Sequence, residues 1–93
     1  ALTQGFRVQD ARGQLHPFRR DQLFLSIFES CKHRMSALPD ATSLTQLVID
    51  RLLQQRSALL KRDEVVRTCA AALKQFDPVA AAVYVAYHPV AQK

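Results

Sequence analysis

Several residue types are scarce in this chain, and so are long apolar runs. Only two glycines and four prolines occur among its 93 residues, which favours regular secondary structure. No apolar run approaches the ~20 residues that a membrane-spanning helix needs. Residues 1–10 lack the apolar stretch of a signal peptide, and the sequence begins with Ala rather than Met. We expect no membrane association, a cytoplasmic location and flexibility at residues 1–5.

Cysteine is also scarce, with Cys31 and Cys69 far apart in the sequence. Each stands among apolar residues at helical spacing. Neither has a second Cys or a His at metal-ligand spacing, although His33 is close to Cys31. This pattern predicts two buried, reduced thiols rather than a disulfide or a zinc site, and no metal centre.

Catalytic motifs are missing as well. The sequence contains neither G-x-G-x-x-G nor G-x-x-x-x-G-K-[ST]. The eight acidic residues are scattered, so no pair of carboxylates stands out. His16, His33 and His88 have no obvious nucleophile or carboxylate partner. We therefore expect a binding protein that needs no cofactor for catalysis, and not an enzyme.

What the chain does have is positive charge and enough apolar residues for a core. Its formal net charge is +5, which favours anionic partners such as nucleotides, nucleic acid or an acidic protein face. The basic residues are spread along the chain, which also fits a solvated basic surface. Hydrophobic residues make up 48% of the sequence. This composition and length predict a single domain over residues 1–93 with one modest core.

The first patterned stretch predicts a β-hairpin. Residues 6–10 (FRVQD) alternate apolar and polar side chains, as a short strand does. Residues 14–18 (QLHPF) suit a second strand, which Pro17 makes an edge or terminal strand. Between them, Gly13 can adopt the positive φ that a tight turn requires.

The period then changes to that of a helix. Apolar residues recur at helical spacing from Arg20, which predicts a first helix ending at about Arg34 or Met35. Residues 36–43 (SALPDATS) are expected to form a loop, because Pro39 stops a helix and Asp40, Thr42 and Ser43 offer N-caps. A second helix follows, with these residues along one side: Leu44, Leu47, Val48, Arg51 and Leu52.

The second half predicts one more strand and two helices. Residues 57–61 (SALLK) form a short apolar run that suits a third strand. Residues 62–76 predict a third helix, whose buried stripe consists of Val65, Val66, Cys69, Ala70, Leu73 and Phe76. Asp77-Pro78 signals a new helix start, and residues 79–88 should form a fourth helix. Its expected core face consists of Val79, Ala80, Val83, Tyr84 and Tyr87. The fold class is therefore α+β, with a hairpin packed on a four-helix cluster.

Over Val8 to about His88, this order of elements resembles the ATP-cone family, the regulatory module of many ribonucleotide reductases and of the bacterial repressor of their genes. Val8, Gly13, Pro17 and Phe18 keep the spacing of the family's opening strand, V-x-K-R-D-G, and of the residues after it. The segments RRDQLFLSIF and LLKRDEVV match its first helix and its short extended segment before the third helix. The family's A-x-Y-I-x-Y-R matches residues 82–88 except at His88.

The resemblance implies an allosteric domain that binds ATP or dATP, with magnesium as a possible companion, and that changes how subunits associate. It places the site between the hairpin and the helices. The corresponding candidate nucleotide-binding residues here are Val8, Arg12, His16, Phe18, Arg19, Gln22 and His88. A protein partner or a homo-oligomer is implied as well.

The chain departs from the family at the phosphate contacts. Asp10 and Ala11 replace a Lys-Arg pair, Arg12 stands at an acidic position, and His16 and Gln22 replace an acidic residue and a lysine. Asp10 should repel a triphosphate, because two like charges ~4 Å apart interact by about 4 kcal/mol at an effective dielectric near 20. Nearby arginines at 7, 12, 19 and 20 offer compensation, or they are solvated or pair with Asp10 and Asp21.

Three hypotheses follow for the function. The domain is a nucleotide sensor with diverged phosphate contacts, or a degenerate cone that docks a protein through helix faces such as residues 80–87 (AAAVYVAY). The third hypothesis is binding of nucleic acid such as DNA by the basic surface, although the sequence offers no recognisable reading helix or aromatic stacking platform.

Overall fold

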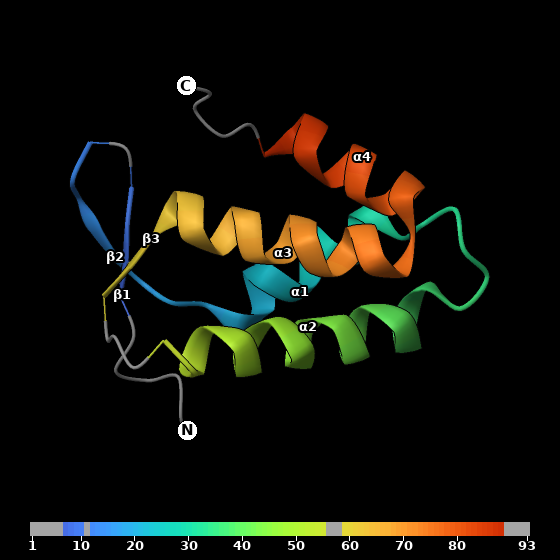
Figure 1. Ribbon diagram of the computed structural model, residues 1–93, viewed down its shortest axis with the longest axis horizontal. Coiled ribbons are helices and arrows are strands. Elements are labelled where there is room, and N and C mark those ends of the chain that lie inside the picture. Colours follow the sequence, from blue (N-terminus) through green and yellow to red (C-terminus); the bar gives the residue numbers. More distant parts are fainter. Residues whose placement is uncertain (1–6, 11, 56–58, 89–93) are drawn as a thin grey trace.

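A three-stranded sheet lies at one end of four helices in the computed structural model, which describes residues 7–10, 12–55 and 59–88 (Figure 1). The α+β class expected from the sequence is confirmed, with the hairpin beside the helical cluster. The expected flexibility of residues 1–5 concerns residues outside the described part.

The sheet is mixed, in the order β2-β1-β3. Strand β1 (Arg7–Gln9) pairs antiparallel with β2 (Leu15–Pro17), which places Val8 opposite His16. Strand β3 (Leu59–Lys61) runs parallel to β1 on its other side. Pro17 therefore lies on an edge strand, as predicted. The predicted third strand is confirmed at residues 59–61, whereas Ser57 and Ala58 lie outside the described residues.

A tight turn closes the hairpin. Gly13 has a φ of +82°, the left-handed conformation that the sequence analysis expected of it. The amide of Asp10 donates to the carbonyl of Gln14, and the amide of Gly13 donates to the carbonyl of Asp10. The turn therefore has a defined backbone hydrogen-bond pattern.

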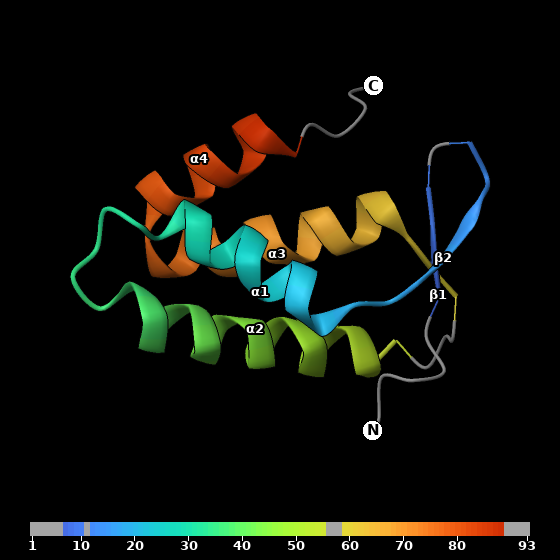
Figure 2. The same ribbon diagram turned by 180° about the vertical axis from the view of Figure 1, so that it is seen from behind.

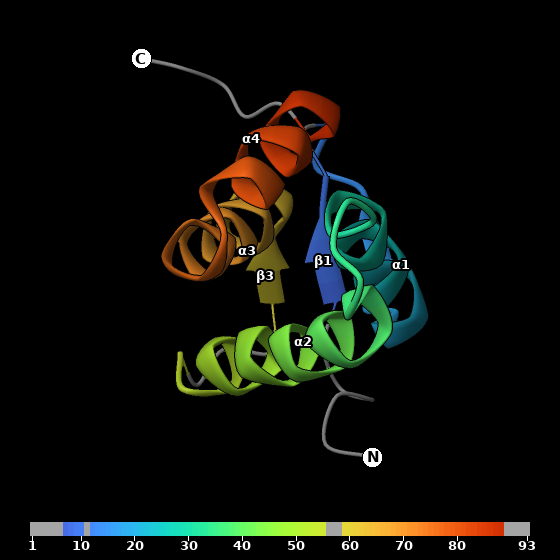
Figure 3. The same ribbon diagram turned by 90° about the vertical axis from the view of Figure 1, so that its right-hand side faces the viewer.

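The four helices surround a common core, as the view along them shows (Figure 3). They are α1 (Arg20–Ser30), α2 (Ala37–Leu53), α3 (Arg62–Phe76) and α4 (Pro78–Tyr87). Helices α1 and α3 each pack against both α2 and α4. The largest fully buried side chains are Ile27, Leu52, Leu60, Leu73, Val48, Thr45, Cys31 and Cys69. Both cysteines are free, as predicted.

The first helix is shorter than predicted. It ends at Ser30, and residues 31–36 form turns instead of continuing to Arg34 or Met35. The amide of Cys31 contacts the carbonyls of both Ile27 and Phe28, as in a tightened last turn. From these turns, His33 and Arg34 contact Asp77 at the junction of α3 and α4.

The predicted loop at residues 36–43 is also wrong, because α2 already begins at Ala37. Pro39 lies in the first turn of α2, where a backbone N–H has no partner within the helix, so proline is tolerated there. The residue at the N-cap position is Ser36, not Asp40, Thr42 or Ser43. On the expected face of α2, Leu44, Val48 and Leu52 are buried, whereas Leu47 is exposed.

Helix α3 has the predicted bounds, and Asp77 caps α4 as predicted. Phe76, expected in the buried stripe of α3, is instead exposed. The guanidinium of Arg34 lies over its ring, with Cζ 4.4 Å from the ring centre. The face predicted for α4 is partly wrong. Ala80 and Tyr84 are buried, but Val79 is 58% and Tyr87 76% exposed. Because α4 is apolar on every side, its sequence does not reveal which side faces the core.

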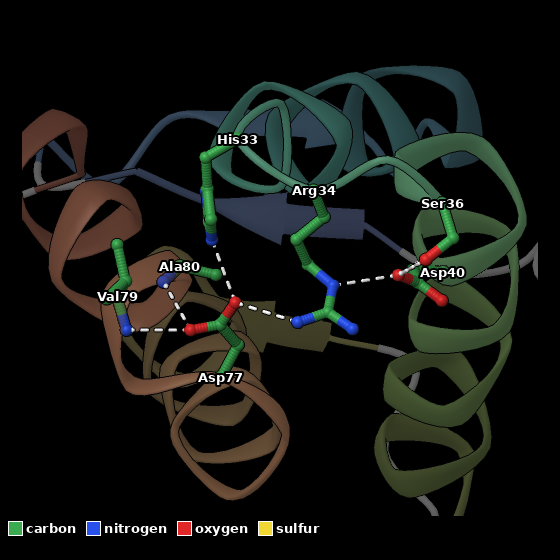
Figure 4. A network of polar contacts seen from close by, with 7 residues as sticks. All are labelled: His33, Arg34, Ser36, Asp40, Asp77, Val79 and Ala80. Atoms are coloured by element: carbon green, nitrogen blue, oxygen red, sulfur yellow. Dashed lines mark hydrogen bonds and ion pairs between the residues drawn. The ribbon is translucent and has the colours of Figure 1, made fainter.

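A network of charged groups joins the turns after α1 to the α3–α4 junction (Figure 4). Asp77 Oδ2 lies 2.8 Å from His33 Nε2 and 3.0 Å from an amino nitrogen of Arg34. The Nε of Arg34 lies 2.8 Å from Oδ2 of Asp40, which also accepts a hydrogen bond from Ser36. The network thus links segments more than 40 residues apart.

Candidate functional site

A cavity of about 370 Å³ lies where the hairpin meets the helices. In Figures 1 and 2 the sheet, the beginnings of α1 and α3 and the end of α4 all lie toward the same end of the molecule. Among the described residues, those lining the cavity are Val8, Asp10, His16, Pro17, Phe18, Arg19, Gln22, Leu23, Ser26, Arg62, Val65, Val66, Tyr84 and His88.

The topology of the sheet explains why these segments meet. Strands β1 and β3 are parallel and in register, with Gln9 opposite Lys61. The residues that follow this pair are Asp10 and Arg62, the latter being the first residue of α3. Arg19 comes directly before α1, after β2. The end of the sheet at Gln9 and Lys61 therefore leads to Asp10 and Arg62, whereas Arg19 reaches the cavity from the opposite end, where Pro17 of β2 pairs with Arg7.

Six of the seven residues predicted for a nucleotide site line this cavity: Val8, His16, Phe18, Arg19, Gln22 and His88. Arg12 is not among the described lining residues. It is exposed in the hairpin turn, where its backbone amide donates to Asp10. The structure thus gathers most of the predicted set, and their role as nucleotide contacts stays a prediction.

The carboxylate of Asp10 is fully engaged within the hairpin. Its Oδ1 accepts hydrogen bonds from the amides of Arg12 and Gln14, each at 2.9 Å, and its Oδ2 lies 2.8 Å from His16 Nε2. The His16 contact, followed by the Gln14 amide, lowers the pKa of Asp10. These donors offset part of the repulsion that Asp10 would exert on an anionic ligand.

Two histidines have carboxylate partners that their sequence neighbourhoods do not reveal. The expectation that His16 and His33 lack such partners is wrong, because His16 pairs with Asp10 and His33 with Asp77. The hairpin brings the first pair together, and the packing of α4 on α1 brings the second. His33 and Asp77 are not among the described residues that line the cavity.

Arg62 is the cation that sequence reasoning missed. The sequence analysis placed it in a helix start without assigning it to the site. Its guanidinium lies 3.7 Å from Asp63 and shares the cavity wall with Arg19. Recognising residues 59–61 as the parallel neighbour of residues 7–9 would have placed Arg62 beside Asp10, but that pairing has no local sequence signal.

The end of α4 supplies an aromatic wall. The rings of Tyr84 and His88 are stacked, with their centres 4.4 Å apart. Burial, and then the nearby thiol of Cys69, raises the pKa of Tyr84. Burial, and then the positive charge of Arg62, lowers the pKa of His88. A neutral imidazole and a phenol ring therefore face the cavity at neutral pH.

The cavity combines an apolar wall with a few charged groups. Its volume lies within the ~300–1,000 Å³ of typical small-molecule sites. Val8, Phe18 and Val65 provide apolar surface, while Arg19 and Arg62 provide guanidinium donors for an anion. This chemistry suits a ligand with a flat ring system and an anionic group.

Metal ligands are not grouped in the part of the chain that the structure describes. Nowhere among these residues do three His, Cys, Asp or Glu side chains come together as a metal site would require. None of the described helices has the length and apolar character needed to cross a membrane.

A second hollow of about 630 Å³ lies between α3 and α4. Its described lining residues are Ala70, Ala71, Lys74, Pro78, Ala81, Ala82, Val85 and Ala86. The predicted docking segment, residues 80–87, is thus only partly available on the surface. Ala80, Ala81 and Tyr84 are buried in the domain's own core, and Ala82, Val85 and Ala86 are exposed.

The sequence was also compared with models of known protein families and with curated proteins, and neither comparison finds a match.

Proposed function

We propose that this domain binds a purine nucleotide such as ATP or dATP in the cavity beneath the hairpin and serves as a regulatory module. The observation that carries the proposal is the convergence of six predicted site residues on one cavity. Those residues were selected from a resemblance to the ATP-cone family, and they come from three separate segments of the chain.

The electrostatics of the cavity support an anionic ligand. Arg19 and Arg62 are the cations of the described wall, and the Asp10 carboxylate is paired with His16. Guanidinium groups bind phosphate through paired N–H donors, so these two arginines are the expected phosphate contacts. Magnesium would accompany the phosphates rather than bind a protein site of its own.

The apolar wall supports a ligand with a base. Phe18 and the stacked pair of Tyr84 and His88 offer ring surfaces against which a purine can pack. Because α4 contributes this wall and also packs on α1 and α3, a ligand that contacts it would bias the position of α4. A shift of that helix is the physical route from binding to regulation.

Calorimetric titration with ATP and dATP, with and without magnesium, tests the proposal. We expect micromolar binding that weakens roughly tenfold or more in Arg19→Ala and in Arg62→Ala, because a charge-assisted contact contributes about 1.5–3 kcal/mol. Arg51→Ala is the matched control, since α2 contributes no described residue to the cavity.

The possible outcomes separate the hypotheses. Equal weakening in all three variants would point to attraction by overall charge rather than to this cavity. No heat at millimolar nucleotide from a folded protein would remove the nucleotide proposal. The hollow between α3 and α4 would then become the place to look for a protein partner, and a steep salt dependence of DNA binding would favour the nucleic-acid hypothesis.

A further inference from the structure

The chain has three histidines, and two of them line the cavity. His16 stands on β2, at the hairpin side, and His88 follows α4, at the helical side. The third, His33, pairs with Asp77 in the network between α1 and α4. Histidine is the side chain whose charge ordinarily changes between pH 5 and 8. Two side chains of this type therefore stand on opposite sides of the cavity.

His16 faces a fixed set of charged groups. Asp10, at the end of β1, lies 2.8 Å from its Nε2, and the other charged residues of the described wall are Arg19 before α1 and Arg62 of α3. The His16 side chain is 54% exposed and is therefore accessible to solvent. A proton on His16 would add a positive charge beside Asp10, on the wall that also carries Arg19 and Arg62.

His88 lies in a more enclosed position. It stacks on Tyr84, and Arg62 approaches it from α3. Glu29 of α1 lines a neighbouring hollow that His88 also lines, but Glu29 is 2.9 Å from Lys32. Burial and the charge of Arg62 both disfavour the protonated imidazole. An anion bound against Arg62 offsets that positive charge, so a ligand there favours a proton on His88.

We propose that binding of a nucleotide in this cavity takes up protons on His16 and His88, so that affinity decreases as the pH rises from 6 to 8. This inference rests on the proposed nucleotide function and specifies its regulation. Coupling between two ligands is reciprocal, so a nucleotide that favours protonation binds more tightly when protons are abundant. The domain thereby responds to pH and nucleotide together.

The test compares the pH dependence of magnesium-ATP binding in four proteins. Wild type, His16→Gln/His88→Gln, His16→Gln and His33→Gln are titrated by calorimetry at pH 6.0, 7.0 and 8.0. At pH 7.0, two buffers of different ionisation enthalpy count the protons taken up. A phosphate group itself titrates near pH 6, but that contribution is the same for every variant.

The slope of affinity against pH, rather than affinity itself, is the measured quantity, because replacing His88 also removes its stacking on Tyr84. Between pH 6.0 and 8.0 we expect wild type to lose roughly tenfold more affinity than the double variant. His16→Gln should fall between them. His33→Gln is the matched control and should follow wild type, and circular dichroism at each pH verifies folding.

Each result decides a different point. Parallel slopes in all four proteins would overturn proton coupling and leave the nucleotide proposal standing. A slope reduced equally by His33→Gln would assign the effect to stability instead of the cavity, and would also overturn it. If no nucleotide binds wild type at any of these pH values, the proposed function fails and this inference fails with it.

Discussion

Asp77 Oδ2 lies 2.8 Å from His33 Nε2, while Oδ1 of the same carboxylate accepts a hydrogen bond from the amide of Val79 at 2.9 Å. One side chain therefore caps α4 and ties it to the turns after α1. Arg34 adds a second contact to Oδ2 and places its guanidinium over Phe76. A single side chain therefore joins the N-terminal end of α4 to these turns through both of its carboxylate oxygens.

Two replacements of Asp77 should separate its roles. Asp77→Asn keeps an oxygen that caps α4 but loses the charge toward His33 and Arg34, whereas Asp77→Ala loses both. We expect both to lower the thermal midpoint, and Asp77→Ala to lower it by about 5 °C more, the effect of one lost cap in a domain of this size. Scanning calorimetry of both variants measures the difference. Equal midpoints would mean that the cap does not stabilise α4.

The same carboxylate should make stability depend on pH in acid. The hydrogen bond from His33, followed by Arg34 and the amides of α4, lowers the pKa of Asp77 to about 2 from an ordinary 3.8. A carboxylate with a lowered folded-state pKa stabilises the fold fully above its unfolded pKa, and this contribution is lost as pH falls toward the folded value. Stability should therefore decline between about pH 4 and pH 2.

Urea unfolding of wild type and Asp77→Asn over pH 2–5 checks this dependence. The two stabilities should converge as the pH falls, because Asn carries no charge to lose. Asp10 and Asp40, whose pKa values are also lowered, contribute to the slope of both proteins and leave the difference to Asp77. Curves that stay a constant distance apart over this range would contradict the assignment.

Thr45→Val should stabilise the domain. The Thr45 side chain is buried in α2, and its Oγ1 has no hydrogen-bond partner among the described residues. A methyl group of the same shape removes a buried, unpaired hydroxyl, which we expect to raise the free energy of unfolding by about 1 kcal/mol. Thr42→Val on the same helix is the control. Thr42 is exposed and donates to the carbonyl of Leu38, so its replacement should change stability little. Destabilisation by Thr45→Val in urea unfolding would show that its hydroxyl is needed.

Gly13→Ala should destabilise the hairpin. A Cβ at this position would lie 3.7 Å from Gln9 Nε2, an ordinary contact, so the loss comes from the backbone, whose φ is +82°. We expect Ala to cost about 1 kcal/mol and Asn to cost less, since Asn visits this conformation more readily. Urea midpoints of the two variants provide the comparison. An equal loss for Ala and Asn would indicate a steric rather than a conformational cause.

The sequence predicts best what local signals determine. Alternation and Gly13 indicate the hairpin, and Asp77-Pro78 indicates the start of α4, because each of these signals lies in one short continuous stretch of sequence. Local signals of this kind do not predict the end of α1 or the start of α2. The turns after α1 contain Arg34, which contacts Asp77, a residue 43 positions away in the sequence. Helix α2 begins before Pro39, because its first turn tolerates a proline.

The candidate site follows the same division. His16, Phe18, Arg19 and Gln22 are near one another in the sequence, and the hairpin-to-helix pattern places them together. Arg62 reaches the cavity only because β3 pairs with β1, about 50 positions earlier in the chain. The pairing of β3 with β1 depends on how the segment between them folds. No short stretch of sequence therefore predicts it.

The cavity has walls from Val8 to His88, nearly the full span of the described residues. During synthesis the hairpin leaves the ribosome before the helices, and this cavity has no complete wall until α4 has emerged and docked. Cleavage of the polypeptide in the turns at 31–36 would leave nine of the fourteen described lining residues on the N-terminal fragment and five on the other. A ligand that needs the whole wall therefore binds only uncleaved protein. In a mixture of cleaved and uncleaved protein, the amount of bound ligand would report the amount of uncleaved protein.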